Sequence, residues 1–243
     1  MIEFRGRLIL LDIEGTVSPL AYVHEVMFPF AREHVAEFLT DHWDQPKTMS
    51  ALEQMAVDAG HSTFIEWCPM EPESGNASAW VVAQVHRLMV EDAKLTGLKQ
   101  LQGLIWEQGF RTGALCATLF DDVAECLHSW YAKGRDLRIY SSGSVQAQQL
   151  FFQHTQAGDL SGLVSGWYDT RTGGKRDPSS YSAIVKDAGC VPEDVLFVSD
   201  VVEELDAARA ANVKTALAIR PGNRETEAMQ HSRIQTLREI VLT

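Results

Sequence analysis

Residues 8–11 form a run of four aliphatic positions that stops at Asp12 and Glu14. An apolar run without polar alternation is typical of a strand buried on both faces of a parallel sheet. Later apolar runs predict further strands at residues 137–140, 163–168, 195–198 and 213–219. Segments with helical signals separate them, at residues 121–134, 145–153, 177–188 and 203–211. This alternation predicts an α/β fold with a doubly wound parallel sheet.

The stretch that follows the first strand has a different pattern. From residue 22 to about residue 115, apolar positions recur at spacings near 3.6, which is typical of amphipathic helices. The periodicity predicts helices at residues 25–39, 46–59, 77–95 and 98–107, with a loop at 71–75. We therefore expect a core of residues 1–19 and 117–243, with a helical domain of residues 20–116 inserted after the first strand.

The charge balance narrows the classes of partner. The 243 residues carry a formal net charge of −12, which argues against nucleic acid or an anionic membrane surface as the main partner. No segment approaches 18 apolar residues, so we predict no membrane span. Four scattered cysteines without metal-binding spacing suggest reduced thiols and a cytoplasmic protein.

Polar residues that could bind a ligand or take part in catalysis follow the predicted strands. The carboxyl ends of parallel strands share one edge of the sheet, where ligands bind in open α/β folds. Taken singly, acids and serines after a strand can be turn formers or helix caps, and a lone lysine is usually a solvated surface charge. Together they favour one crevice formed by Asp12, Glu14, Ser141, Ser142, Lys175 and Asp200.

Carboxylates gathered in one crevice repel each other, by about 4 kcal/mol for two charges ~4 Å apart at an effective dielectric near 20. A hard divalent cation such as Mg²⁺ removes this repulsion, because it prefers carboxylate oxygens and water as ligands. The cation also admits a phosphate dianion. Ser141 and the backbone N–H groups after Ser142 can donate to phosphate oxygens, and Lys175 adds positive charge.

Asp12 is placed to attack phosphorus as a carboxylate nucleophile and to form an aspartyl-phosphate. Glu14, two residues on, can protonate the leaving oxygen and then deprotonate the water that hydrolyses the intermediate. For Glu203 and Glu204 we favour an interaction with the helix dipole, and a supporting role for Glu204 behind the metal ligands is the less favoured alternative.

The order of these motifs resembles the haloacid dehalogenase superfamily of phosphotransferases. The matching features are Asp-x-acid-Gly-Thr from Asp12, a strand followed by Ser141, then Lys175, then a strand ending in Ser-Asp at Asp200. The helical insert resembles the mobile cap of that superfamily. Most of its phosphatases carry Asp two residues after the nucleophile, and here Glu14 stands there.

That departure and several longer strings make the chain similar to the enolase-phosphatase E1 family. The strings are residues 12–16, 98–107, 140–148, 174–175, 180–181 and 197–208. One difference is Val17, where the family more often has Thr. The resemblance covers essentially the whole chain, cap included.

The resemblance implies a Mg²⁺-dependent acireductone synthase of methionine salvage. Such an enzyme enolises 2,3-diketo-5-methylthiopentyl 1-phosphate and then dephosphorylates the enol to acireductone. It also implies a monomer acting on a small-molecule phosphate ester, with Asp12, Glu14 and Lys175 in catalysis. The implied metal ligands are Asp12, Glu14 and Asp200, and the implied substrate contacts are Ser141, Ser142 and Lys175.

Two alternatives remain open from the residues themselves. One is another capped phosphatase of the haloacid dehalogenase type. The other is a signalling module that accepts phosphate on an Asp at a strand end. The long helical insert argues against the signalling module, because a receiver domain needs no cap.

Overall fold

The computed structural model describes residues 1–71, 75–226 and 230–243 of the chain. Contacts between residues divide it into two compact units. The first unit comprises Met1–Val23 and Cys116–Thr243, and the second is His24–Leu115. Residues 72–74 of the loop expected at 71–75 lie outside the described part, so that loop is not tested.

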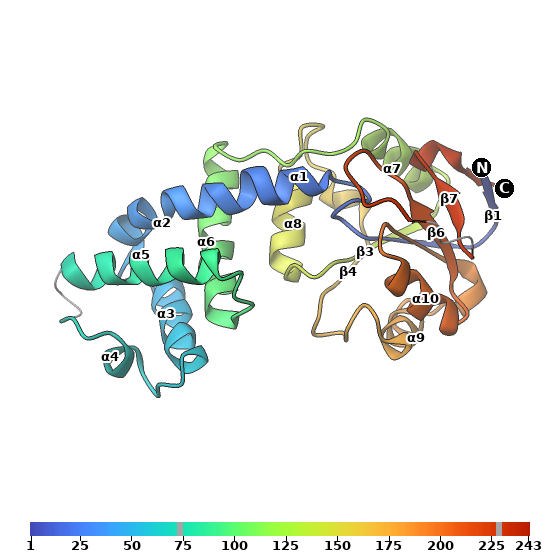
Figure 1. Cartoon of the computed structure of the whole chain (residues 1–243). Coiled ribbons are helices and arrows are strands. Elements are labelled where there is room, and N and C mark those ends of the chain that lie inside the picture. Colours follow the sequence, from blue (N-terminus) through green and yellow to red (C-terminus); the bar gives the residue numbers. More distant parts are fainter. Residues whose placement is uncertain (72–74, 227–229) are drawn as a thin grey trace. The chain divides into compact units, whose positions relative to one another are not determined.

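The first unit is built on a parallel sheet of six strands in the order β4-β3-β2-β5-β6-β7 (Figure 1). Strand β2 (Leu8–Leu11) lies in the middle, between β3 (Asp136–Tyr140) and β5 (Val195–Ser199). Beyond them lie β4 (Gly166–Tyr168) on one side, and β6 (Lys214–Ala218) and β7 (Ser232–Ile234) on the other. The strand order therefore reverses at β2, and a ligand crevice is expected at the carboxyl end of such a strand.

Burial explains why residues 8–11 are aliphatic throughout. All four are at most 1% exposed, and Ile9 pairs with Leu137 on β3 and Leu196 on β5. Leu8 and Leu10 belong to a cluster with residues of helices α9 (Pro178–Asp187) and α10 (Val202–Ala210). Figure 1 shows these two helices on one side of the sheet and α7 (Val123–Ala132) on the other. The predicted doubly wound α/β class is confirmed.

The two remaining helices of this unit that flank the sheet are α7 (Val123–Ala132) and α8 (Val145–Gln153). Sequence periodicity missed three of the three-residue strands in the described residues, because so short a run carries little pattern. They are β7 at the sheet edge and the pair β1 (Ile2–Phe4) and β8 (Ile240–Leu242), which brings the two termini together (Figure 1). The strand expected at 163–168 is confined to Gly166–Tyr168, because Ser161–Leu163 form a 3₁₀ turn.

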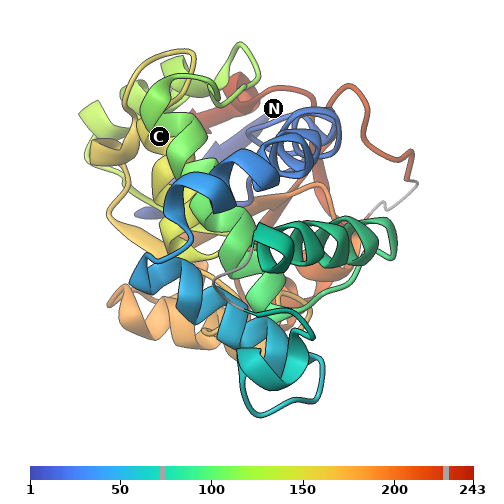
Figure 2. The ribbon, with the colours of Figure 1, turned by 90° about the vertical axis from the view of Figure 1, so that its left-hand side faces the viewer.

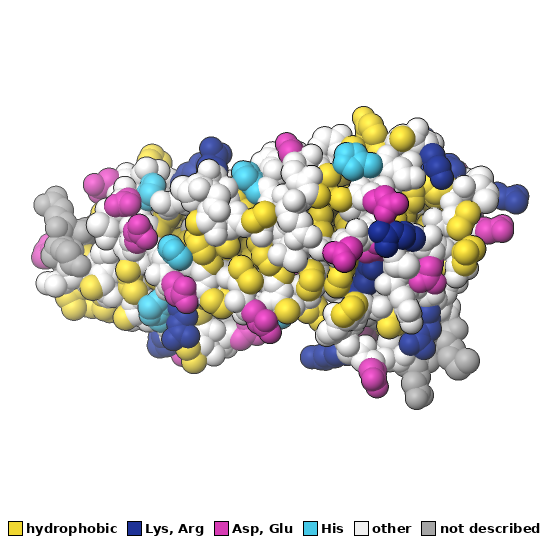
Figure 3. All heavy atoms as spheres, turned by 90° about the horizontal axis from the view of Figure 1, so that it is seen from above, with side chains coloured by type: hydrophobic (Ala, Val, Ile, Leu, Met, Phe, Trp, Pro, Cys, Tyr) yellow, Lys and Arg dark blue, Asp and Glu magenta, His cyan; other side chains and the backbone are white. Residues whose placement is uncertain are grey.

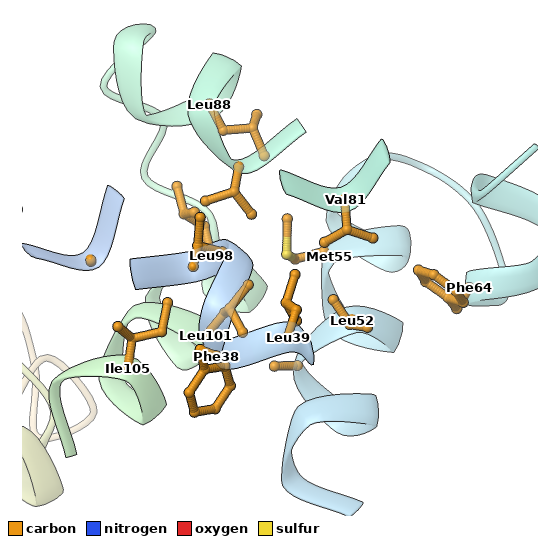
Figure 4. Close-up of a cluster of buried hydrophobic side chains, with 14 of the residues drawn as sticks. Phe38, Leu39, Leu52, Met55, Phe64, Val81, Leu88, Leu98, Leu101 and Ile105 are labelled. Atoms are coloured by element: carbon orange, nitrogen blue, oxygen red, sulfur yellow. The ribbon is translucent and has the colours of Figure 1, made fainter. Parts of the chain in front are cut away.

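The second unit is a bundle of helices with its own hydrophobic core (Figure 2). Figure 4 shows this core, with Phe38 and Leu39, Leu52 and Met55, Val81 and Leu88, and Leu98, Leu101 and Ile105 directed toward one another from four helices. Those helices are α2 (Phe28–His42), α3 (Pro46–Asp58), α5 (Gly75–Val90) and α6 (Thr96–Thr112), and Phe64 comes from the short α4 (Phe64–Trp67).

Helix boundaries in this unit differ from the sequence expectation where a residue adopts an unusual backbone conformation. The helix expected to reach residue 95 ends at Val90, because Asp92 has φ +50° and the N–H of Ala93 bonds back to the carbonyl of Leu88. Helices that end in this left-handed conformation usually have Gly at that position, so the end of this helix at Val90 was not predictable from the sequence. The helix expected to begin at residue 25 is preceded by α1 (Leu20–Tyr22) and a π-helical turn, Val23–Met27.

On the face drawn in Figure 3, Lys and Arg side chains are interspersed with Asp and Glu. None of the helices in the described residues combines the length and the apolar character needed to cross a bilayer.

Two glycines of α6 give a paired test of packing in the second unit. A Cβ on Gly97 would lie 2.3 Å from the backbone nitrogen of Met55, whereas a Cβ on Gly103 would meet no atom within 4 Å. We expect Gly97→Ala to lower the free energy of unfolding by about 1–3 kcal/mol through overpacking. Gly103→Ala should raise it by about 0.5–1 kcal/mol, because Ala loses less backbone entropy in a helix.

Urea unfolding of the full chain followed by tryptophan fluorescence measures both variants. Four of the six tryptophans, at positions 43, 67, 80 and 106, belong to this unit. Equal stability changes in the two variants would contradict the proposed close contact between α3 and α6.

Candidate active site

Three strands deliver polar residues to the same edge of the sheet. Asp12 follows β2, and its N–H donates to the carbonyl of Val198 on β5 at 3.0 Å, so its backbone is held by the sheet. Ser141 follows β3, and its N–H donates to the carbonyl of Tyr168 at 3.1 Å. Asp200 follows β5 directly. The parallel register therefore aligns the chain positions from which these side chains project.

These residues line one cavity of about 130 Å³, which lies within the first unit. All six residues expected from the sequence contribute to its wall. The lining residues are Asp12, Glu14, Leu20, Ser141, Ser142, Lys175, Asp200, Val201 and Glu204.

Lys175 lies at the centre of the charged groups. Its Nζ is 2.7 Å from Oδ1 of Asp12 and 2.6 Å from Oε2 of Glu204. The three side chains are only 6–12% exposed, so water screens these contacts weakly. The hydroxyl of Ser199 donates to Oε2 of Glu204 at 3.0 Å and lies 3.4 Å from Oδ2 of Asp12. Asp12 and Glu204 are thus joined from both sides.

The negative charge of the cavity exceeds what Lys175 balances. Burial, together with the carboxylates of Asp12 and Glu204, raises the pKa of Asp200 to about 7. For Lys175, burial opposes the charged form, but the carboxylates of Asp12 and Glu204 outweigh it and raise its pKa. The lysine therefore stays protonated, and the cavity favours a further cation.

Gly15 is required by its backbone and by its neighbour. It has φ +69°, and a Cβ at this position would lie 2.3 Å from Oδ2 of Asp200. The backbone after Glu14 therefore passes directly against the carboxylate of Asp200. Any larger residue would displace either the turn or the acid.

Two buried tyrosines hold the loop that carries Lys175. Tyr181 donates its hydroxyl to the carbonyl of Lys175 at 2.7 Å, and Tyr140 donates to the carbonyl of Gly173 at 2.9 Å. Both rings are fully buried. Sequence analysis did not assign them this role, although a buried tyrosine hydroxyl usually finds a partner.

The donor atoms of the cavity fit the metal that the sequence predicts. No three Asp, Glu, His or Cys side chains of the described residues already converge as a complete ligand set. Asp12, Glu14 and Asp200 nevertheless line one small cavity. The pKa of Asp200 is raised first by burial and then by the neighbouring carboxylates of Asp12 and Glu204, whose negative charge a divalent cation would neutralise. The donor set is all oxygen, which suits Mg²⁺.

The chain was compared with known proteins. The model of the haloacid dehalogenase-like hydrolases matches residues 7–212. Enolase-phosphatase E1 from Synechococcus elongatus is 42% identical over 232 residues, which are 96% of each chain. The chain belongs to the enolase-phosphatase E1 family.

A second relative and a solved structure agree with this chain in sequence and in fold. Enolase-phosphatase E1 from Aquifex aeolicus is 42% identical over 88% of this chain and 90% of its own. The crystal structure of the UTR4 protein from Saccharomyces cerevisiae has a TM-score of 0.78 and 29% identity, covering 97% of this chain and all of that one. The resemblance to the enolase-phosphatase E1 family is thus confirmed.

In this member of the enolase-phosphatase E1 family, the structure does not support helix capping as the role of Ser141, Ser142 or Asp200. The side chain that caps α8 is Ser144, not Ser141 or Ser142, and α10 begins after Val201 without a side-chain cap from Asp200. In contrast, the side chain of Asp177 caps α9 by accepting from the N–H of Ser179.

The two acids at the start of α10 have different surroundings. Glu203 is exposed, as an interaction with the helix dipole allows. Glu204 is buried and contacts Lys175 and Ser199, so the favoured dipole interpretation misses its main interaction. The sequence signal for a role of Glu204 in the site was its four-residue spacing from Asp200, because one helical turn brings its side chain back toward the end of β5.

A double-mutant cycle tests the coupling at the centre of this site. Lys175→Met leaves Asp12 and Glu204 buried without their shared cation, and we expect it to lower the free energy of unfolding by about 3 kcal/mol. Adding Glu204→Gln removes one of the facing charges and should recover at least about 1 kcal/mol.

Urea unfolding at pH 8 measures the cycle, and Lys186→Met on the exposed face of α9 serves as the matched control, with a change within about 0.5 kcal/mol. Strict additivity of the two substitutions would show that the ion pair is not energetically coupled.

Proposed function

We propose that this protein is a Mg²⁺-dependent enolase-phosphatase of methionine salvage. In this proposal it enolises 2,3-diketo-5-methylthiopentyl 1-phosphate and then hydrolyses the enol phosphate to acireductone and inorganic phosphate. The observation that carries the proposal is the joining of Asp12, Lys175 and Glu204 in a cavity that Ser141 and Ser142 also line. The relatives named enolase-phosphatase E1 supply the choice of substrate.

Asp12 is the proposed nucleophile. Its Oδ1 accepts hydrogen bonds from Lys175 and from the N–H of Ile13, both at 2.7 Å, which fixes the orientation of the carboxylate. One oxygen attacks phosphorus, the bond from phosphorus to the ester oxygen breaks, and an aspartyl-phosphate forms. Water then attacks phosphorus, inorganic phosphate leaves, and the carboxylate of Asp12 is restored.

Glu14 is the proposed acid and base of these two steps. It lines the same cavity as Asp12 and follows it by two residues. In the first step it gives its proton to the departing ester oxygen. In the second step it takes a proton from the attacking water, so its protonation state is restored after each cycle.

Ser141, Ser142 and Lys175 are the proposed phosphate-binding groups. Ser141 and Ser142 line the cavity. Neither caps the following helix α8, because Ser144 has that role. Both can donate to phosphate oxygens, and the ammonium of Lys175 offsets phosphate charge. Lys175 also holds Asp12, so it aligns nucleophile and substrate.

Asp12, Glu14 and Asp200 are the residues that would hold Mg²⁺. When bound, the ion would offset the charge that accumulates when a phosphate dianion meets several carboxylates. The excess of acids over Lys175 in the cavity and the raised pKa of Asp200 support this assignment.

Three further expectations accompany the proposal. The helical unit His24–Leu115 is proposed to be a cap domain, because it is inserted in the chain after β2. The monomeric state and the cytoplasmic location implied by the sequence stay predictions. The proposed partner is a small-molecule phosphate ester.

Asp12→Asn separates the two chemical steps. We expect it to reduce phosphate release by at least about 10³-fold, because the amide is not a nucleophile, while some enolisation persists. The measurement is an ultraviolet time course with the diketo phosphate and Mg²⁺, with inorganic phosphate assayed in parallel. In the wild-type protein, enol absorbance should precede or accompany phosphate.

Asp194→Asn is the matched control, because Asp194 is exposed and lies just before β5. Phosphate release by Asp12→Asn at the wild-type rate would rule out the nucleophile. Hydrolysis of generic esters without action on the diketo phosphate would retain the phosphatase and reject the enolase-phosphatase activity.

A further inference from the structure

The segment after β6 forms a tight turn from Arg220 to Asn223. The N–H of Asn223 donates to the carbonyl of Arg220 at 3.1 Å, Pro221 occupies the second position, and Gly222 has φ +86°. These are the features of a type II turn, which needs a positive φ at its third position. Arg220 and Asn223, at its two ends, are not among the described residues that line the cavity.

Both side chains contact the backbone that follows the proposed nucleophile. The amide of Asn223 donates to the carbonyl of Gly15 at 2.8 Å and to that of Ala218 at 3.1 Å. The Nε of Arg220 donates to the carbonyl of Thr16 at 3.0 Å. Two consecutive carbonyls of the catalytic turn are therefore held by a segment more than 200 residues away in sequence.

The turn at residues 13–18 depends on these partners for its outer side. Three of its internal hydrogen bonds converge on the carbonyl of Ile13, which accepts from the N–H groups of Thr16, Val17 and Ser18, and a fourth runs from the N–H of Gly15 to the carbonyl of Ser18. They leave the carbonyls of Gly15 and Thr16 to be satisfied from outside, by Asn223 and Arg220.

Arg220 is itself firmly anchored. Its side chain is 3% exposed, and its Nη1 lies 3.0 Å from both carboxylate oxygens of Asp122 and 2.9 Å from the carbonyl of Gln235. Its guanidinium stacks over Phe120 at 4.7 Å. The turn from Arg220 to Asn223 is thus a rigid support rather than a loose loop.

The same contact region holds polar atoms that stability alone does not explain. In the described part of the chain, Oγ1 of Thr16, Nη2 of Arg220 and Oδ1 of Asn223 are buried without a hydrogen-bond partner. Buried unpaired polar atoms cost free energy. Such atoms are retained where a local arrangement serves the site.

We propose that the turn from Arg220 to Asn223 positions the catalytic turn, with Asn223 as the main positioning residue. By fixing the carbonyl of Gly15, Asn223 fixes both Glu14, which precedes it, and the backbone surface against which the carboxylate of Asp200 lies. Glu14 and Asp200 are therefore held ready for Mg²⁺. This inference rests on the proposed function.

Asn223→Ala tests the inference, because Asn223 is partly exposed and its loss should leave the fold intact. Outer contacts to metal ligands typically change metal affinity or activity 10–100-fold. We expect kcat for the diketo phosphate to fall about tenfold with little change in KM, and Mg²⁺ binding to the metal-free protein, measured by calorimetry, to weaken about tenfold. Asn223→Asp, which keeps the size but removes the donor, should behave similarly.

Gln156→Ala is the matched control, since its amide donates at 3.0 Å to the carbonyl of Leu119, outside the catalytic turn. It should leave kcat and Mg²⁺ binding unchanged. Wild-type kcat and Mg²⁺ affinity in both Asn223 variants would overturn the inference, as would a fall in melting temperature without a change in either quantity. If the wild-type protein bound Mg²⁺ but did not act on the diketo phosphate, the proposed function would be wrong. Calorimetry of Mg²⁺ binding to the Asn223 variants would still test the positioning role.

Discussion

The structure of the first unit is governed by the repulsion between acids that share one small cavity. Asp12, Glu14, Asp200 and Glu204 line about 130 Å³ together with Lys175. Two like charges ~4 Å apart repel by about 4 kcal/mol at an effective dielectric near 20, which is a large part of the stability of a domain. The surrounding fold must therefore hold these acids in place against their own field.

The fold meets this requirement by fixing backbone rather than side chains alone. The buried strands β2 and β5 lock the backbone of Asp12, and Gly15 passes against Asp200 without a Cβ between them. Tyr140 and Tyr181 hold the loop of Lys175 by its carbonyls. The backbone of Asp12 and the loop of Lys175 are thus supported by hydrogen bonds to main-chain atoms, which a change in charge elsewhere disturbs little.

The sequence predicted the parts of this arrangement that depend on local pattern. The aliphatic run at residues 8–11 identified the central strand, and the acids and serines at strand ends identified the edge that carries the cavity. The contact of Lys175 with Glu204 joins a loop to the first turn of α10 across the cavity, so no local spacing encodes it. The left-handed Asp92 and the short strands β1, β7 and β8 also escaped prediction, because tertiary contacts outweigh local propensity in such short segments.

The division of the chain separates chemistry from the helical insert. Every described residue that lines the cavity belongs to Met1–Val23 or Cys116–Thr243, while His24–Leu115 has a hydrophobic core of its own. The residues that hold Asp12 and Lys175 also belong to the first unit, so the geometry of these two side chains is built without a contribution from the core of the insert. The groups proposed for phosphoryl transfer are therefore held by the sheet edge and the loops of the first unit.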